Sequence, residues 1–561
     1  MHNVYREEAL RFARICFANW NRDPASPSCG CFDRQYWGWK KKDMPDATFQ
    51  AAIVLVLRAS DREGRTEALG GLLPHYVAFL EKIQHGNGSF DQIYPNERAP
   101  GVIHDMLSSL VWLSRWPHLP ADLRDRLERI MERGVSYALS SDEKHGEIAN
   151  HFAQYAWELI NYGIAFGRAD ALAYGRRYLE RTLALFRPEE GWFLEYDGAD
   201  AGYQTRCVSF LARIAELTND DALWDQLERA VTFLSEISMP DGSLHPMLGV
   251  RSTALAYVSG IERVAQRFPH LRPFADRMHE SWRTGKTPTP TLLDFENGLR
   301  IADDGWEAAE LRERRLAEAP KDKLPARDPA EPEHLVDFDL PQAGLLRRVT
   351  ITPETKLVTY VGSRLGGTVV IYDCTTGSEP RLAFEDSGYL LKLSDGTRWV
   401  MRHAGSGEDP SSDDGSISLV ASFAKALHED LSPSQMLLLR TLNLTVLRSQ
   451  FIGDIFKKLV VRRLISGREL FPLKCRRSIS WSGNAIVIAD RFEAGAGFAQ
   501  RLKGARLFRC RRTIANHMAS SRYFQPQELT LSQPWIEELS IDALDGRIVE
   551  QVVPPRSISR A

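Results

Sequence analysis

Asn87-Gly-Ser-Phe90, Glu190-Gly-Trp-Phe193 and Asp241-Gly-Ser-Leu244 are three turn sequences that decide the expected fold of this chain. Each places a glycine where the chain reverses and ends in a bulky apolar residue. The second and third are 51 positions apart, and the first lies about two such periods before the second. A period near 50 residues fits a hairpin of two helices of about 15–20 residues each. About five or six such hairpins closed into a ring predict an incomplete (α/α) toroid.

The first part of the chain supports this repeat, because apolar residues recur there at helical spacing. The pattern begins at residues 5–17, and alternation of period two is scarce up to about residue 315. We therefore expect residues 1–315 to form the toroid. Further helices are predicted at 46–59, 65–83, 100–115, 121–139, 147–165, 169–186, 203–217, 221–237, 252–267 and 272–284.

Proline and charged residues dominate residues 316–337, which predicts a linker. From residue 338 the chain changes to short runs rich in β-branched and aromatic residues, separated by turns such as Ser394-Asp-Gly. This pattern predicts an antiparallel β-sandwich over residues 338–561. Strands are expected at 344–352, 356–362, 368–373, 389–393 and 485–492. Segments 433–447 and 451–465 fit either strand or helix, and strand is preferred.

Composition excludes several classes of protein. The net charge of −3 gives no global field of the kind that marks a nucleic-acid binder. The N-terminus lacks the basic region, the apolar region and the cleavage site that make up a secretory signal. Apolar runs such as Ala51–Leu57 are far shorter than the roughly 20 residues that a helix needs to cross a bilayer. The seven cysteines are scattered, which indicates free thiols in a reducing cytoplasm. The sequence therefore predicts a protein without a transmembrane segment that is cytoplasmic, or periplasmic if the start codon is misassigned.

Two short segments carry the chemistry that the sequence offers. Asn150-His151 lies at the edge of one helical unit, and the stretch from Glu195 to Gln204, which includes Tyr203, lies at the edge of the next. An amide, an imidazole and a phenol on one rim can neutralise a sugar carboxylate and move a proton beside it. This combination points to a uronic-acid polysaccharide as the substrate.

A helical toroid followed by a β-sandwich, with Asn-His and Gly-Tyr-Gln at the ends of consecutive helical units, resembles the heparinase II/III-like polysaccharide lyases and related alginate lyases. Four further stretches look like heparinase II/III-like proteins of bacterial exopolysaccharide clusters: Asp33–Trp39, Gly88–Glu97, Asp386–Tyr389 and Ser520–Phe524.

The resemblance implies roles for particular residues. Asn150 would bind the substrate carboxylate, and His151 and Tyr203 would be catalytic. Gln204 belongs to the same element and is a substrate-binding candidate, and His403 would be the histidine that the sandwich supplies in this family. No cofactor is implied, although sandwiches of this family can hold a structural divalent ion.

β-Elimination needs charge stabilisation as well as proton transfer. Removal of a proton alpha to a carboxylate builds a dianionic enolate, which must be stabilised where its charge develops. Arg251 could add a fixed cation that contacts a carboxylate in bidentate fashion. His151 or Tyr203 could each serve as base or acid, and the sequence does not assign them. Trp37 and Trp39, with Tyr36, could floor the substrate groove.

The same residues also fit different roles and different activities. Asn150 could cap a helix, and Tyr203 could be a core residue. A pair of carboxylates could run an inverting glycoside hydrolysis, and a C5-epimerase would share the proton abstraction. A third alternative is a non-catalytic protein that binds an acidic polysaccharide during exopolysaccharide synthesis. The carboxylates considered for hydrolysis are Asp91, Glu97, Glu195, Asp197 and Asp200.

Overall fold

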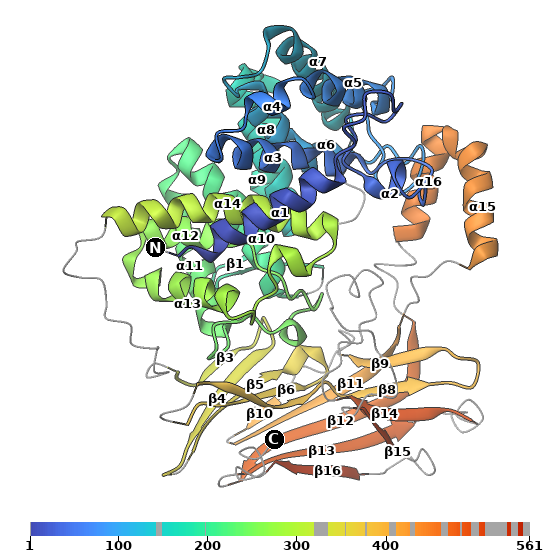
Figure 1. Cartoon of the computed structure of the whole chain (residues 1–561). Coiled ribbons are helices and arrows are strands. Elements are labelled where there is room, and N and C mark those ends of the chain that lie inside the picture. Colours follow the sequence, from blue (N-terminus) through green and yellow to red (C-terminus); the bar gives the residue numbers. More distant parts are fainter. Residues whose placement is uncertain are drawn as a thin grey trace.

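Helices form the first part of the molecule and antiparallel sheets form the second (Figure 1). The computed structural model describes residues 2–141, 148–196, 198–318, 335–353, 355–375, 379–402, 411–413, 415–426, 432–461, 469–482, 485–494, 504–510, 536–539 and 548–553. The helices of the first part are α1 (Val4–Asn19), α2 (Arg34–Trp37), α3 (Ala52–Arg62), α4 (Glu67–Gly70), α5 (Leu73–Ile83), α6 (Pro100–Ser114), α7 (Ala121–Leu139), α8 (Ala149–Phe166), α9 (Ala169–Ala184), α10 (Ala201–Thr218), α11 (Asp221–Ile237), α12 (Ser259–Arg267), α13 (Arg272–Arg283) and α14 (Phe295–Glu318). A two-stranded sheet, β1 (Phe186–Arg187) and β2 (Trp192–Phe193), lies between α9 and α10.

The recurring turns share one backbone geometry. Gly88, Gly191 and Gly242 all have positive φ, which only glycine adopts without strain. At each turn a Cβ would collide with the backbone carbonyl of a residue in a later helix, and Gly30 repeats the arrangement with φ +98°. Each turn therefore needs glycine for two reasons, the positive φ and the close approach of a backbone carbonyl. The carbonyls that face Gly30, Gly88, Gly191 and Gly242 belong to His75, Arg133, Arg229 and Arg277, in the same order.

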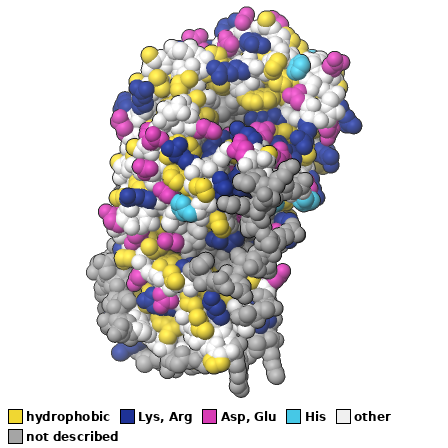
Figure 2. Space-filling model, turned by 90° about the vertical axis from the view of Figure 1, so that its left-hand side faces the viewer, with side chains coloured by type: hydrophobic (Ala, Val, Ile, Leu, Met, Phe, Trp, Pro, Cys, Tyr) yellow, Lys and Arg dark blue, Asp and Glu magenta, His cyan; other side chains and the backbone are white. Residues whose placement is uncertain are grey.

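The first and last helices of this part pack against each other. α1 lies along α14 (Figure 1), and the Asn3 side chain donates a hydrogen bond to the carbonyl of Ala309 at 3.2 Å. One apolar core runs through the helices and continues into the second part of the chain, where it includes Val358 and Tyr360 of a β-sheet. Side chains of both charges are interspersed over the helical surface that Figure 2 shows, in agreement with the small net charge.

The second part contains two larger sheets, and every strand pair in them is antiparallel. One has the order β3-β4-β5-β6-β7, and the other β15-β14-β8-β9-β11-β12-β13-β16, with β10 paired to β11. The sheets share a core in which Leu346 and Val369 of the first meet Leu391 and Ile479 of the second. The strands are β3 (Phe338–Leu340), β4 (Leu345–Ile351), β5 (Lys356–Gly362), β6 (Thr368–Asp373), β7 (Arg381–Asp386), β8 (Tyr389–Lys392), β9 (Arg398–Arg402), β10 (Ser411–Asp413), β11 (Ser416–Ala426), β12 (Leu470–Ser482), β13 (Ala485–Ala494), β14 (Arg506–Cys510), β15 (Ile536–Leu539) and β16 (Ile548–Val553).

A buried cluster of charges ties the strands together. The Arg477 guanidinium is fully buried and binds Asp490 at 2.7 Å and Asp386 at 2.8 Å. Tyr389 donates to the other oxygen of Asp490 at 2.8 Å, and Arg509 donates to the Tyr389 hydroxyl at 2.9 Å. The stretch Asp386–Tyr389, which contributed to the family resemblance, thus supplies two members of a structural ionic network.

The preference for strands at 433–447 and 451–465 is wrong. The described residues up to 461 form α15 (Pro433–Leu444), a short 3₁₀ turn at Val446–Arg448 and α16 (Gln450–Val461), and residues 462–465 lie outside the described part of the chain. Ser432 explains the start of α15, because its hydroxyl accepts from the Gln435 backbone while the Gln435 side chain accepts from the Ser432 backbone. Apolar runs of this length do not separate strand from helix, and the cap decides.

Two expectations concern the chain as a whole. No helix among the described residues is both long and apolar enough to cross a bilayer. All seven cysteines are described, and each is buried and forms no disulfide.

Candidate active site

The N-terminus of α8 and the segment before α10 are joined by Asn150 and Glu195. The Asn150 backbone N–H donates to one oxygen of Glu195 at 2.8 Å, and its side-chain amide donates to the other at 2.6 Å. Both residues are completely buried. Burial raises the pKa of Glu195 to about 8, so this carboxyl is mostly protonated at neutral pH. The Asn150 side-chain amide nitrogen is therefore engaged by the protein itself, and Asn150 does not cap α8, whose N-cap residue is Ile148.

Tyr203 and Arg251 meet at the N-terminus of α10. Asp200 caps this helix by accepting from the Tyr203 backbone N–H at 3.2 Å, and its second oxygen accepts from the Arg251 backbone N–H at 2.9 Å. A side-chain hydrogen bond joins Arg251 to Tyr203. The Arg251 guanidinium also lies over the ring of Tyr196 at 4.4 Å, and the rings of Tyr196 and Tyr203 are 6.3 Å apart. Two segments distant in sequence, residues 196–203 and the segment that contains Arg251, thus converge on one phenol.

The protonation of Tyr203 follows from its surroundings. Burial raises its pKa well above the usual range and Tyr196 adds to this effect, while the positive charge of Arg251 acts in the opposite direction. Tyr203 is 7% exposed and Arg251 is 1% exposed. The hydroxyl therefore keeps its proton at neutral pH and can act as a proton donor.

His151 is half-buried on the first turn of α8, next to the fully buried Asn150. Its ring lies 6.3 Å from that of Tyr155. The His151 imidazole lies close enough to the Asp105 carboxylate of α6 to interact with it electrostatically. His151 is the more accessible of the two residues predicted to be catalytic.

The structure gives Gln204 a structural position. Its amide nitrogen donates to the carbonyls of Gly191 and Ala230 at 3.1 and 3.4 Å, and its amide oxygen accepts from the Phe193 backbone at 2.9 Å. Since the residue is 1% exposed, contact with a substrate would require these bonds to break. Gln204 thus holds the Glu190–Phe193 turn in place.

Trp37 and Trp39 lie at and just beyond the end of α2. The Trp37 indole donates to the carbonyl of Asn19 at 2.8 Å, whereas Trp39 is 61% exposed. The guanidinium of Arg34 lies 5.4 Å from the Trp39 ring. An exposed indole of this kind is available as a stacking surface. His403, the candidate from the second part of the chain, lies outside the described residues.

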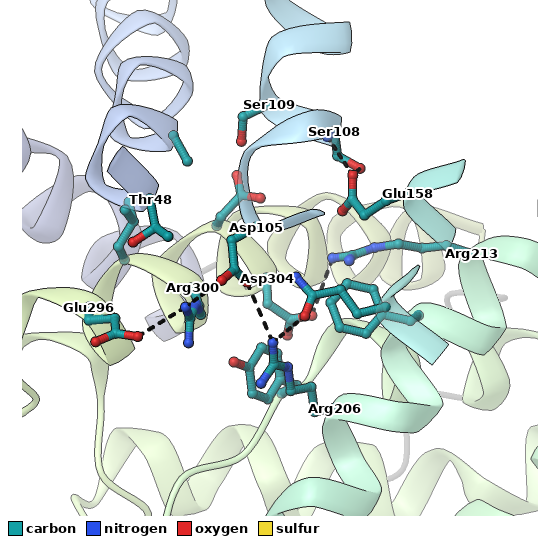
Figure 3. Close-up of a pocket in the computed structure, with 16 residues that line it drawn as sticks. Thr48, Asp105, Ser108, Ser109, Glu158, Arg206, Arg213, Glu296, Arg300 and Asp304 are labelled. Atoms are coloured by element: carbon teal, nitrogen blue, oxygen red, sulfur yellow. Dashed lines mark hydrogen bonds and ion pairs between the residues drawn. The ribbon is translucent and has the colours of Figure 1, made fainter. Parts of the chain in front are cut away.

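A polar cavity lies between helices α6, α8, α10 and α14 (Figure 3), and its lining does not include Asn150, His151, Tyr203 or Arg251. It encloses about 80 Å³ and is lined by the next turns of α8 and α10 together with α6 and α14. Asp105 receives hydrogen bonds from Arg300 at 2.9 Å and from Gln154 at 2.7 Å, and Arg206 lies 3.7 Å away. Burial would raise the pKa of Asp105, but the charges of Arg300 and Arg206 outweigh it and lower that pKa.

Glu158 shows the opposite behaviour in the same cavity. Burial raises its pKa to about 8, although it accepts from the Ser108 backbone and hydroxyl at 2.6 and 2.7 Å. The sequence interpretation missed the cavity residues. A signal for them exists, because Gln154 and Glu158 recur at four-residue spacing after Asn150 on an otherwise apolar helix. Polar residues on the buried stripe of a helix indicate a cavity or an ionic network.

The carboxylates considered for hydrolysis serve local structure. Asp91 accepts from the Asn96 and Arg98 backbones at 2.8 and 2.9 Å and pairs with His85, and Glu97 accepts from the Ile93 backbone at 2.8 Å. Glu195 binds Asn150 and Asp200 caps α10, as described above. Asp197 lies outside the described residues. No group of three or more histidine, cysteine or acidic residues in the described part of the chain is placed to hold a metal ion.

Similar solved structures are polysaccharide lyases, the class that the sequence resemblance names. A heparan sulfate lyase HepC mutant from Pedobacter heparinus matches with 12% identity and a TM-score of 0.42, over 91% of this chain and 70% of that one. Heparinase III matches with 10% identity and a TM-score of 0.46, over 91% and 72%. A chondroitinase AC lyase matches with 9% identity and a TM-score of 0.45, over 90% and 68%. No protein-family model and no curated protein sequence match the chain.

Proposed function

We propose that this chain is a polysaccharide lyase that cleaves a uronate-containing glycan by β-elimination. The proposal includes an incomplete (α/α) toroid over residues 1–315, a linker over 316–337, whose first three residues continue α14, and a β-sandwich over 338–561. The observation that carries it is the convergence of Tyr203, Tyr196 and Arg251 at the N-terminus of α10, where Asp200 binds the backbones of both Tyr203 and Arg251. A phenol with a guanidinium beside it, at the positive end of a helix, suits a reaction that develops negative charge.

The roles of acid and base follow from protonation and accessibility. Tyr203 keeps its proton because of burial, so it is assigned as the acid that protonates the departing O4. His151, half-buried on α8, is assigned as the base that takes the C5 proton, because imidazole is the side chain that commonly accepts a proton near neutral pH. Arg251, which is 1% exposed, would stabilise the tyrosinate that Tyr203 becomes when it gives up its proton, and the N-termini of α8 and α10 would stabilise the enolate.

Glu195 is compatible with this scheme. An ionised carboxylate close to Asn150 would repel the carboxylate of a uronate. The raised pKa of about 8 keeps Glu195 mostly uncharged at neutral pH, so this repulsion is small. The resemblance to proteins of exopolysaccharide clusters suggests a bacterial exopolysaccharide as the substrate.

The test is a panel of acidic polysaccharides assayed for ultraviolet-absorbing unsaturated uronate. Tyr203→Phe removes the proton donor and should lower turnover by about 10²-fold or more. Tyr174→Phe is the matched control, since this half-buried residue is on α9 and its ring contacts Arg177. Both variants should keep the helical circular dichroism signal of the parent.

Different products would assign a different function. New reducing ends without unsaturation would indicate a hydrolase, and a change in the uronate ratio without chain cleavage would indicate a C5-epimerase. Binding without turnover would indicate a polysaccharide-binding protein. Full activity of Tyr203→Phe would remove Tyr203 from the mechanism.

A further inference from the structure

The two helices α15 and α16 form an insertion between paired strands. β11 and β12 are hydrogen-bonded neighbours, and their ladder extends to Ala424 opposite Leu470. A short turn would be sufficient to connect these ends, yet residues 427–469 lie between them. In Figure 1 α15 and α16 stand away from the sheets and beside the helical part near α2. We call residues 432–461 the helical insertion.

The helical insertion exposes large apolar side chains. Leu437, Leu444 and Phe451 are 68%, 67% and 75% exposed. No described residue of the insertion belongs to any of the three core clusters. Such a concentration of exposed apolar surface is rare on a protein without a partner for it. The remaining exposed apolar residues of the insertion are Met436, Leu438, Val446, Ile452 and Ile455.

Mainly polar contacts hold the helical insertion against the rest of the molecule. Arg440 forms an ion pair with Asp43, and the Asn87 side chain hydrogen-bonds Gln450 at 3.4 Å. Among the rings, Phe456 meets Tyr94 at 6.3 Å. The contacts therefore leave most of the apolar side chains facing outward, the reverse of what packing alone would favour.

The sequence of the helical insertion has more basic than acidic residues. Its sequence contains Arg440, Arg448, Lys457 and Lys458 against a single acidic residue, Asp454, in a chain whose net charge is −3. Asp43, the partner of Arg440, follows Trp39-Lys-Lys-Lys42, where Trp39 is 61% exposed. Apolar and aromatic side chains with basic neighbours are the composition of helices that lie in a membrane interface.

We propose that the helical insertion binds the surface of an anionic lipid bilayer, with Leu437, Leu444 and Phe451 entering the interface. Charge complementarity selects this occupant, because a second copy would place basic insertions against each other, whereas an anionic bilayer accepts both the apolar and the basic side chains. The insertion would thus hold the protein at a membrane without spanning it. This proposal is independent of the lyase activity.

The experiment is flotation of the full chain with vesicles of phosphatidylcholine, with and without phosphatidylserine. The triple variant Leu437→Ser, Leu444→Ser, Phe451→Ser should weaken binding to phosphatidylserine vesicles by about tenfold or more. The double variant Leu292→Ser, Ile351→Ser removes residues that are 68% and 70% exposed but lie outside the insertion, and it should bind as the parent does. Arg448→Glu should weaken binding at low salt.

Three results would overturn the proposal. The first is that the parent protein does not bind phosphatidylserine vesicles. The second is that the triple and double variants lose vesicle binding to the same extent. The third is that the parent forms a concentration-dependent dimer, which the triple variant abolishes, and does not bind vesicles. Turnover of the glycan substrate by the triple variant should equal that of the parent, so failure of lipid binding is distinguishable from failure of the lyase assignment.

Discussion

Replacement of Gly88 by alanine tests the idea that the recurring turns need glycine for two separate reasons. Gly88 has φ +91°, and a Cβ there would overlap the carbonyl oxygen of Arg133 and lie 2.6 Å from the carbonyl carbon. The left-handed backbone costs an L-residue about 1–2 kcal/mol. The overlap adds about 1–3 kcal/mol, because backbone rather than a flexible side chain must move.

Two other glycines allow the cost of the backbone strain to be separated from the cost of the overlap. Gly64 has φ +66° with nothing within 4 Å of its Cβ position, so Gly64→Ala has the strain without the collision. Gly70 lies in α4 with an equally open Cβ position and no positive φ, so Gly70→Ala has neither. Alanine also restricts the unfolded chain, which stabilises each variant by about 0.4–1 kcal/mol. Gly88→Ala should therefore lose about 2–4 kcal/mol, Gly64→Ala at most about 1–2 kcal/mol, and Gly70→Ala nothing.

The assay is urea unfolding followed by far-ultraviolet circular dichroism, with the midpoint of the helical transition compared among the three variants. The order of midpoints should be Gly70→Ala, then Gly64→Ala, then Gly88→Ala, with the last clearly separated. A Gly88→Ala midpoint equal to or above that of Gly64→Ala would refute the role of the close carbonyl contact.

Three further predictions concern buried carboxyl groups. Arg477→Met should lower the free energy of unfolding by about 3–5 kcal/mol, since Asp386 and Asp490 would lose their buried counter-charge; an unchanged urea midpoint would contradict this. Between about pH 4.5 and about pH 8, Glu158 is protonated in the folded protein and ionised in the unfolded chain. Its contribution to stability is therefore present below pH 4.5 and is lost as pH rises to about 8. Glu158→Gln should flatten that decline, measured as the difference in urea midpoint across the range, and an equally steep decline would argue against it. Glu195→Gln places an amide NH₂ against a donor of Asn150, which costs about 1–3 kcal/mol, and it should reduce glycan turnover, whereas full turnover would show that this contact does not position the site.

Much of the helical part could be predicted from sequence because its helices bury one apolar stripe each. The segments expected at 121–139 and 221–237 match α7 and α11 at both ends. Strands expected at 356–362 and 368–373 also match β5 and β6. The strand prediction for 433–447 and 451–465 is wrong, since the apolar residues there face outward and no buried stripe marks the period.

The candidate site was predictable in part. The pattern located Asn150 and Tyr203 at helix starts, but it could not show that the Asn150 amide is engaged by Glu195. Contacts between residues some 45 positions apart leave no trace in local periodicity. Gln204 illustrates the same limit, because an amide next to a candidate catalytic tyrosine turned out to bind backbone carbonyls.

The Asn150–Glu195 contact has a consequence for the timing of assembly. It fastens the first turn of α8, which carries His151, to the strand-like segment that leads into Tyr203. The spacing of imidazole and phenol is therefore established when the polypeptide folds. In the proposed mechanism His151 and Tyr203 would then need no rearrangement when a ligand enters, because the cost of ordering them would already be met in the folded protein.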